Sequence, residues 1–489
     1  MNHSSSEVDL RSIAEQVVRA RGFNPQFPSP VQLQVGQIES HPPAIAATES
    51  IRDLRSLLWS SIDNDDSKDL DQIEVAETLP NGDTKVLVAI ADVDAFAGKD
   101  SPIDAHAARE TTTVYTGVRV FPMLPEQLST GLTSLLEGAD KLSVVTEFVV
   151  GPDGQIQASD IYRAVVRNRA QLTYSAVGKW LAANGSSNSK VSGSVELQGQ
   201  LRLQSEIAEK LKQQRFKHGA LTIESTELQP IMSGEQIIGV ADREKNRASE
   251  LIEELMIAAN ESVARMFEAK NVSSIRRVVK TPERWNRIVA LAAQHGGNLP
   301  ADPDPKALND FLVKRKAEDP DHFADVSLAV VKLMGPGEYV LERPGDTGVG
   351  HFGLAVQDYT HSTAPNRRFA DVVTQRLIKS ILAGKTSPYS DELLNAIAKT
   401  CTERQDAARK VQRDMQKRIA AVALKDSIGR NFDAIVTGNN EHGTFVRIMK
   451  PHVEGMLVSG HEGVDVGDRL RVKLVNTDVR RGYIDFVIT

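Results

Sequence analysis

The pattern of apolar and polar positions changes character twice along the 489-residue chain. Over residues 8–21 apolar side chains recur at helical spacing, which predicts one short amphipathic helix. A proline-rich stretch follows up to residue 43, and because proline fixes φ and removes a backbone donor, we expect this connector to be irregular. Residues 1–50 are therefore interpreted as an arm and linker rather than as a domain.

Residues 51 to about 395 mix strand and helix signals without a break long enough to mark a linker. The run at 86–91 is short and almost wholly apolar, as in a strand that is buried on both faces, whereas residues 250–267 repeat apolar side chains at helical spacing. From residue 391 onward the pattern is that of one long charged helix, or of two in series. This part of the chain is predicted to have a mixed α/β (α+β) fold.

The last segment, residues 430–489, contains five short strands separated by turn signals, the number expected of a small closed OB barrel. The turn at 438–443, the outward-facing Phe445 and the turn at 466–468 before a basic strand resemble the S1 RNA-binding domain. An exposed aromatic side chain on such a barrel can stack on a base, which makes Phe445 an RNA-binding candidate. The alternative is a purely structural Phe445.

The amino-acid composition mainly excludes certain kinds of site and classes of protein. The single cysteine, Cys401, cannot form an internal disulfide, and no cysteine cluster is present for a structural zinc or an iron–sulfur centre. The sequence has no stretch of about 18 apolar residues, and its first 20 residues lack the apolar core of a signal peptide. We therefore expect a cytoplasmic protein that does not enter a membrane.

Charge is informative only locally, because the net charge of −7 does not indicate a nucleic-acid partner. Residues 51–100 hold twelve Asp and Glu against five Lys and Arg, whereas residues 361–430 hold fourteen Lys and Arg against seven Asp and Glu. The first block can hold cations and the second can hold phosphates if the fold brings them together. The alternative is two solvated surfaces.

The acidic block contains the most informative motif, SIDNDDSKDLDQ at residues 61–72. Asp69 and Asp71 are two residues apart, so in an extended chain their carboxylates lie on one face and Leu70 lies on the other. Asp63 ends the preceding apolar run and adds a third carboxylate. Such a cluster repels itself unless divalent cations neutralise it, and hard oxygen ligands suit magnesium or manganese in phosphoryl transfer or hydrolysis.

Two other interpretations of this segment are open. Its polar residues match positions 1, 3, 5, 7, 9 and 12 of a calcium-binding EF-hand loop; they are Asp63, Asp65, Ser67, Asp69, Asp71 and Glu74. Against this match, the sixth position is Lys68, where the sharp turn of the loop requires glycine, and a Pro-Asn-Gly turn and a strand soon follow. The remaining interpretation is a solvated acidic turn.

Residues 62–72 also resemble the signature of the ribonuclease II family of exoribonucleases, a strand ending in Ile-Asp followed by Asp-x-Asp-Asp. Further segments follow in the family's order: FPMLP at 121–125, HGAL at 218–221, LIEELMIAAN at 251–260, HFGLA at 351–355 and YTHSTAPNRRFAD at 359–371. The resemblance spans roughly residues 52–489. It implies an RNB catalytic domain over residues 51–429 and an S1-type barrel over residues 430–489.

The resemblance implies the residues of the site as well. The metal ligands would be Asp63, Asp69, Asp71 and Gln72, and the catalytic residues would be Asp71 and Arg367. The RNA contacts would come from Tyr115, Glu253, Arg368 and Phe445. In these roles the arginine stabilises charge on the scissile phosphate, the tyrosine stacks on the terminal base and the glutamate contacts the terminal ribose.

Three of these roles have structural alternatives. Tyr115 could be a core tyrosine, and Arg367 and Arg368 could each serve an internal ion pair, which for Arg368 would be with Asp371. Glu253 is preferred to Glu254 because it lies at the shoulder of the apolar stripe of its helix, whereas Glu254 is expected to point to solvent.

Two departures from the family pattern bear on activity. The fourth aspartate of the pattern is Gln72 here, and a neutral amide is a weaker magnesium ligand than a carboxylate, although Asp65 or Asp66 could supply the missing charge. The long members of the family also begin with cold-shock-type barrels, for which an arm of about 50 residues is too short. RNA capture is therefore expected to depend on the S1 module, the catalytic channel or a protein partner that binds the arm.

The resemblance implies a magnesium-dependent exoribonuclease that hydrolyses single-stranded RNA in the 3′→5′ direction to 5′-nucleoside monophosphates. Manganese is a second candidate cofactor, and the chain is expected to be a monomer. The first alternative is an RNA-binding protein with a degenerate, inactive RNB domain. The second is a calcium-binding protein.

Overall fold

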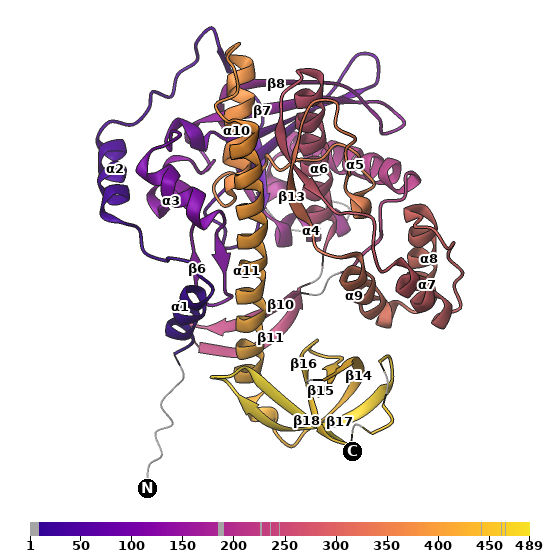
Figure 1. The fold of residues 1–489 in the computed structure, drawn as a ribbon. Coiled ribbons are helices and arrows are strands. Elements are labelled where there is room, and N and C mark those ends of the chain that lie inside the picture. Colours follow the sequence, from indigo (N-terminus) through magenta and orange to yellow (C-terminus); the bar gives the residue numbers. More distant parts are fainter. Residues whose placement is uncertain are drawn as a thin grey trace.

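The computed structural model describes residues 9–183, 190–224, 227–234, 236–243, 245–441, 443–460, 462–464 and 466–489. A central sheet with its helices forms the larger part, and a small barrel lies at the far end of one long helix (Figure 1). The helices are α1 (Leu10–Ala20), α2 (Ser29–Ser40), α3 (Pro102–Glu110), α4 (Tyr174–Ala182), α5 (Val195–Lys217), α6 (Arg247–Ala269), α7 (Trp285–Gln294), α8 (Pro305–Glu318), α9 (Phe323–Met334), α10 (Phe369–Leu382) and α11 (Asp391–Ala423).

The strands before the barrel are β1 (Ile51–Asp53), β2 (Ser60–Asp63), β3 (Gln72–Thr78), β4 (Thr84–Ala91), β5 (Val114–Tyr115), β6 (Val120–Phe121), β7 (Asp140–Val150), β8 (Ile156–Arg167), β9 (Ala170–Thr173), β10 (Glu227–Ser233), β11 (Gln236–Arg243), β12 (Ser274–Val278) and β13 (Glu338–Glu342). The barrel strands are β14 (Asn431–Asn440), β15 (Gly443–Ile448), β16 (Glu454–Ser459), β17 (Arg469–Asp478) and β18 (Tyr483–Ile488).

Seven strands form the central sheet, in the order β1-β8-β7-β4-β3-β2-β9. Adjacent strands from β8 to β2 in this row are antiparallel, whereas the edge strands β1 and β9 pair in parallel with β8 and β2. The apolar run at 86–91 lies in β4, and all six of its residues are buried between β3 and β7. The predicted mixed α/β (α+β) fold is confirmed.

Side chains alternate between the two faces of the sheet, and each face has its own hydrophobic core. On one face, Val86 and Val88 pack with residues of α4, α5 and α6. On the other face, Leu87 and Ala89 pack with Trp59 and Leu70. Leu70 therefore points inward, as its alternation with the aspartates on either side predicts.

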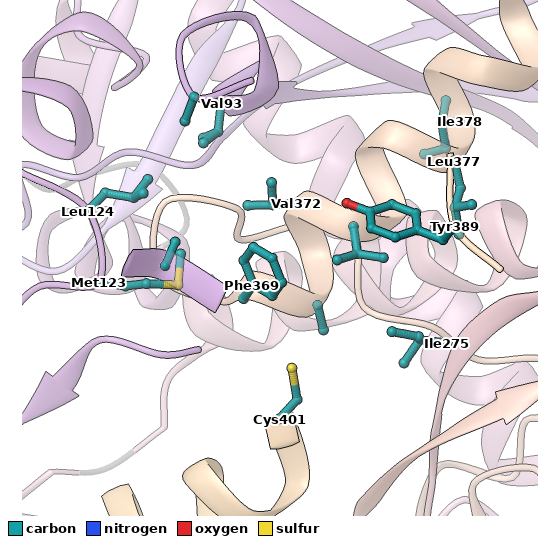
Figure 2. Close-up of a cluster of buried hydrophobic side chains, with 14 of the residues drawn as sticks. Val93, Met123, Leu124, Ile275, Phe369, Val372, Leu377, Ile378, Tyr389 and Cys401 are labelled. Atoms are coloured by element: carbon teal, nitrogen blue, oxygen red, sulfur yellow. The ribbon is translucent and has the colours of Figure 1, made fainter. Parts of the chain in front are cut away.

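A third core joins α10 to the sheet and to the long helix α11. Figure 2 shows Phe369 and Val372 of α10 close to Met123, with Cys401 of α11 on the other side of the cluster. The lone cysteine is 3% exposed and serves as a small apolar residue. This packing fixes the start of α10, and the loop before that helix belongs to the candidate site.

The N-terminal arm packs on its own chain. Apolar residues of α1 lie in a cluster with β5, β6 and α11, which contains Ala14, Val17, Val18, Phe23, Val114, Phe121, Val411 and Met415. The expectation of an irregular connector is wrong for residues 29–40, which form α2. Proline is tolerated in the first helical turn because the N–H groups there have no intrahelical partner, and Val31 and Val35 bury one face of the helix.

Residues 431–488 form a closed five-stranded barrel in the order β14-β15-β16-β18-β17, as predicted. Its core includes Ala420, Ala421 and Leu424 at the end of α11, which is one continuous helix of 33 residues. The hairpin β10–β11 also reaches the barrel, where His452 Nδ1 lies 2.8 Å from Asp242 Oδ2. Among the helices of the described ranges, none is both long enough and apolar enough to span a bilayer.

Candidate active site at the end of the central sheet

The acidic segment is a loop between two neighbouring strands, since β2 ends at Asp63 and β3 begins at Gln72. The EF-hand interpretation is wrong, because that loop joins two helices whereas strands flank this one. Ser134 fixes the centre of the loop: its hydroxyl donates to the carbonyl oxygen of Lys68 at 2.7 Å and accepts from the N–H of Leu70 at 2.9 Å. The carboxylates of the loop are thus held by the fold.

Asp63 and Asp69 each have one carboxylate oxygen engaged. Asp63 Oδ1 accepts hydrogen bonds from the N–H of Asn64 at 2.7 Å and from the hydroxyl of Ser67 at 2.8 Å. Asp69 Oδ2 accepts from the hydroxyl of Tyr115 at 3.4 Å. These contacts orient the carboxylates before any ligand binds.

Asp71 meets a loop that is distant in sequence, residues 364–368 before α10. The N–H of Asn366 donates to Asp71 Oδ1 at 2.9 Å, and Arg367 Nε lies 3.6 Å from Asp71 Oδ2. The side chain of Asp71 is 4% exposed, whereas that of Arg367 is 44% exposed, so the guanidinium remains accessible to a ligand. The structure therefore brings together the two residues predicted to be catalytic.

Arg368, the next residue, turns away from the loop. Its Nη2 lies 2.7 Å from Oδ1 of Asp371 in the first turn of α10, and the same oxygen accepts from the N–H of Ala364 at 2.8 Å. This ion pair closes the turn that presents Arg367. The arrangement favours the internal role of Arg368 over the predicted RNA contact.

Tyr115 lies on β5, beside the same loop. The N–H of Thr113 donates to the carbonyl oxygen of Arg367 at 3.0 Å, and the N–H of Phe369 donates to that of Thr111 at 2.8 Å. The tyrosine side chain is 40% exposed while its hydroxyl reaches Asp69. An exposed ring at this place can stack on a base that lies next to the carboxylates.

Burial dominates the protonation of the acidic residues. It raises the pKa of Asp71 to about 8, although the charge of Arg367 opposes this rise. Burial also raises the pKa of Asp69, and the nearby charge of Asp63 raises it further. The pKa of Glu74 on β3 lies well above its ordinary value for the same two reasons. The positively charged side chains thus do not neutralise all of the negative charge of these carboxylates. A bound divalent cation would neutralise the remainder.

The donor set fits a hard divalent cation, although in this conformation no three His, Cys, Asp or Glu side chains of the described residues enclose a metal position. Asp63, Asp69 and Asp71 offer carboxylate oxygens at one end of the sheet, the ligand type that magnesium and manganese prefer. Both side-chain oxygens of Glu74 are buried and lack a hydrogen-bond partner among the described residues. Gln72 is 9% exposed at the start of β3, where it pairs in register with Ile90 of β4.

Two of the predicted RNA contacts lie outside this cluster. Phe445 is half-buried on β15, where it alternates with the buried residues Thr444 and Val446 on the barrel, and Figure 1 places the barrel at the opposite end of α11 from the sheet. Glu253 on α6 has a side chain that is 41% exposed and lies 2.8 Å from Lys245 Nζ. Their roles in RNA binding stay predictions.

The expected orientation of Glu254 is wrong. This residue is 4% exposed, and its Oε2 accepts from Arg215 Nε at 2.9 Å. The physical reason is that α6 packs against α4 and α5 as well as the sheet, so its buried surface is much wider than one apolar stripe. A charged residue can lie inside that surface because α5 supplies its partner.

Sequence reasoning missed three members of this site. Asn366 acts through its backbone and Ser134 through one hydroxyl, so neither residue type carries a signal. Glu74 was considered only as the last ligand of an EF-hand. A signal for it was present, because an acidic residue interrupts an otherwise apolar stretch at an inward-facing position of a strand.

Comparison with known proteins finds two family matches along the chain. Residues 51–384 match the RNB domain family, and residues 430–489 match the RNase II-type exonuclease C-terminal S1 domain. Ribonuclease R of Thermotoga maritima is 31% identical over 473 residues, which cover 89% of this chain and 64% of that protein. The chain spans about three fifths of the length of the curated relatives it matches.

Solved structures share the fold. Mycoplasma genitalium RNase R in complex with ribose-methylated single-stranded RNA superposes with a TM-score of 0.87 and 22% identity, covering 98% of this chain and 78% of that one. The yeast pseudonuclease Ssd1 superposes with a TM-score of 0.72 and 18% identity, covering 97% and 58%. Because the RNB match covers more than half of its residues, this protein belongs to the RNB-domain family and carries a C-terminal S1 domain of the RNase II type.

Proposed function

We propose that the protein is a magnesium-dependent exoribonuclease, which hydrolyses single-stranded RNA from its 3′ end and releases 5′-nucleoside monophosphates. The observation that supports this most is the approach of the exposed Arg367 guanidinium to Asp71, 3.6 Å from Nε to Oδ2, beside two further carboxylates. Metal-assisted phosphodiester hydrolysis uses a cation held by hard oxygens together with positive charge near the scissile phosphate. The relatives named ribonuclease R align with about nine tenths of this chain or more and support the same chemistry.

In this proposal each residue has a distinct task. Asp63, Asp69 and Asp71 hold the cation, which when bound supplies Lewis acidity and a water of lowered pKa. Arg367 donates to a non-bridging oxygen of the scissile phosphate, a geometry that suits its planar guanidinium. Asn366 keeps the Asp71 carboxylate in place while the substrate strand advances.

The RNA would be held at two places. Tyr115 stacks on the terminal base, a contact that tolerates any sequence because every base has a π-face. On the barrel, Phe445 and the exposed basic side chains of β17, Arg469, Arg471 and Lys473, would follow the strand further from the cut. Glu253 is proposed to contact a ribose hydroxyl.

A second candidate function is RNA binding without cleavage. It is favoured by the neutral Gln72 next to Asp71 and by the fold shared with yeast Ssd1, a pseudonuclease. This candidate predicts RNA affinity that does not depend on magnesium and no release of mononucleotides. Under either candidate function, the protein is expected to be cytoplasmic and monomeric. Sedimentation can test the oligomeric state.

The two candidates separate in one gel experiment with 5′-labelled single-stranded RNA, magnesium and the full-length protein. We expect a ladder that shortens to a small 5′ fragment, and no shortening with EDTA or with Asp71→Asn. Asp310→Asn on the exposed surface of α8 is the matched control and should cut like the wild type. Intact RNA that still shifts in a native gel would favour the pseudonuclease instead.

A further inference from the structure

Glu74 is a buried carboxylate to which the proposed function gives no task. Its side chain is 0% exposed, and neither Oε1 nor Oε2 has a hydrogen-bond partner among the described residues. Removing a carboxylate from water without a partner costs free energy, so proteins normally pair such a group or use it to bind a cation. Glu74 therefore presents two oxygens to a ligand that the described part of the chain does not supply.

Its position on β3 places it next to the acidic loop. Side chains alternate along a strand, so Glu74 shares its face with Gln72, the residue at which the loop ends. In the register of the sheet Glu74 lies opposite Ser60 of β2, and Asp63 ends that same strand. Glu74 is therefore two residues along β3 from the end of the acidic loop, and it lies beside the strand that ends at Asp63.

The composition of the loop makes a further carboxylate useful. Gln72 follows Asp71 directly and is a neutral amide, so it brings no charge to a divalent cation. We propose that Glu74 contributes the carboxylate that position 72 does not, as an additional ligand of the divalent cation, either directly or through one cation-bound water. The inference rests on the proposed function, because it concerns the same cation.

The distances along the strand permit this role. Two residues of a strand span about 6–7 Å, and a glutamate side chain is one methylene longer than an aspartate and leans along the strand. Magnesium keeps several of its waters in proteins, so a carboxylate need not touch the ion to hold it. The buried apolar surroundings of Glu74 make each such contact stronger than it is in water.

A purely internal role is the rival explanation. Gln204 on α5 is also 0% exposed, and both of its amide atoms lack partners among the described residues. One helical turn earlier, Gln200 bonds the N–H and carbonyl groups of Ala76 on β3 at 2.9 and 2.7 Å, so this face of α5 lies against the strand that carries Glu74. A protonated Glu74 in contact with Gln204 would stabilise the fold without affecting cation binding.

The test is a titration of the full-length protein with Mn²⁺ in the absence of RNA, with the electron paramagnetic resonance signal of free Mn²⁺ as the readout. Glu74→Gln keeps the shape of the side chain and removes its charge. We expect its Kd for Mn²⁺ to rise at least tenfold and the Tm of the metal-free protein not to fall. The matched control is Glu77→Gln on the same strand, where the side chain is 62% exposed and pairs with Lys85, and its Kd should be unchanged.

A rescue variant makes the test sharper. In Gln72→Asp/Glu74→Gln the carboxylate moves by two residues on one face of β3, and most of the Mn²⁺ affinity should return. An unchanged Kd in Glu74→Gln overturns the inference, and an unchanged Kd together with a lower metal-free Tm assigns Glu74 to the contact with Gln204.

The failures of the two proposals are distinguishable. If the wild type binds Mn²⁺ and shortens RNA while Glu74→Gln binds Mn²⁺ equally well, only the role of Glu74 is wrong. If the wild type neither binds Mn²⁺ nor releases nucleotides, the proposed function fails and the Glu74 role fails with it.

Discussion

At the scale of single residues, the site depends on contacts that local sequence patterns do not show. Arg367 and Arg368 are adjacent, yet one guanidinium is open beside Asp71 and the other pairs with Asp371. The alternation of Asp69, Leu70 and Asp71 in the acidic loop was sufficient to predict that Leu70 points inward, because alternation is a local property. Which arginine meets that loop depends on the turn before α10, and no pattern within the turn reports it.

Arg367 should act mainly on the chemical step. Removing a donor that stabilises charge on the scissile phosphate typically costs about 10²–10³ in kcat. We expect Arg367→Ala to lose kcat by this factor with a smaller change in KM, measured on single-stranded RNA under steady-state conditions. Arg287→Ala, on the exposed face of α7, is the matched control, and near wild-type kcat in Arg367→Ala would contradict the assigned role.

His351 gives the stability of the fold a pH dependence. Its ring packs on Tyr359, and burial lowers the pKa of His351 to about 4, with the charge of Arg277 lowering it further. As the pH falls below 6.5, the unfolded chain binds a proton that the folded chain does not, so the free energy of unfolding decreases. We expect this residue to account for a loss of about 1–2 kcal/mol between about pH 7 and pH 5 in urea unfolding. Equal pH slopes for the wild type and His351→Gln would contradict this.

At the scale of elements, the arm supports the hairpin that carries Tyr115. Residues of α1, β5, β6 and α11 share one apolar cluster, so the position of the hairpin depends on a helix more than 90 residues earlier in the chain. The helix itself was predictable from its apolar spacing, whereas α2 was not, because prolines near a helix start and prolines in a loop look alike in sequence. Both helices are fixed by tertiary contacts.

Loosening that cluster should affect RNA binding through Tyr115. Val18→Ala leaves a cavity under the hairpin, and we expect it to lower kcat/KM about tenfold, mainly through KM, because small misplacements of a positioning residue are costly. Val330→Ala on α9 removes the same atoms from a separate buried cluster and should leave KM unchanged.

A double-mutant cycle decides whether Val18 acts through Tyr115. If it does, Val18→Ala should add little to the KM of Tyr115→Ala, because the positioned group is already absent. Fully additive effects would show that the arm affects RNA binding by another route.

At the scale of the whole molecule, α11 joins the sheet to the barrel. It contacts the separate two-stranded sheet of β12 and β13 and also the hairpin β10–β11, and it enters the barrel core at its C-terminal end (Figure 1). The five barrel strands were predictable, because short strands and turns are local signals. Contacts between the barrel and the rest of the chain, such as the pair of Asp242 and His452, join residues 210 positions apart and have no local signature.

Because the barrel is separated from the carboxylates, the contribution of Phe445 to RNA affinity should depend on the length of the RNA. A stacked aromatic side chain contributes about 1–3 kcal/mol per base, so Phe445→Ala should weaken binding of a 20-nucleotide RNA about tenfold. An oligonucleotide of about five residues, bound only near Tyr115, should bind equally well to both proteins. A fluorescence anisotropy titration measures both affinities, and an equal loss for the two RNAs would contradict the remote position of Phe445.

The most direct test of the account is mass spectrometry of the nucleotides that the full-length protein releases from a single-stranded RNA of defined 3′ sequence, in magnesium and H₂¹⁸O. The account predicts 5′-monophosphates that appear in order from the 3′ end, each with one ¹⁸O on its phosphate, and no release in EDTA. Cyclic phosphates, internal fragments or intact RNA would contradict it.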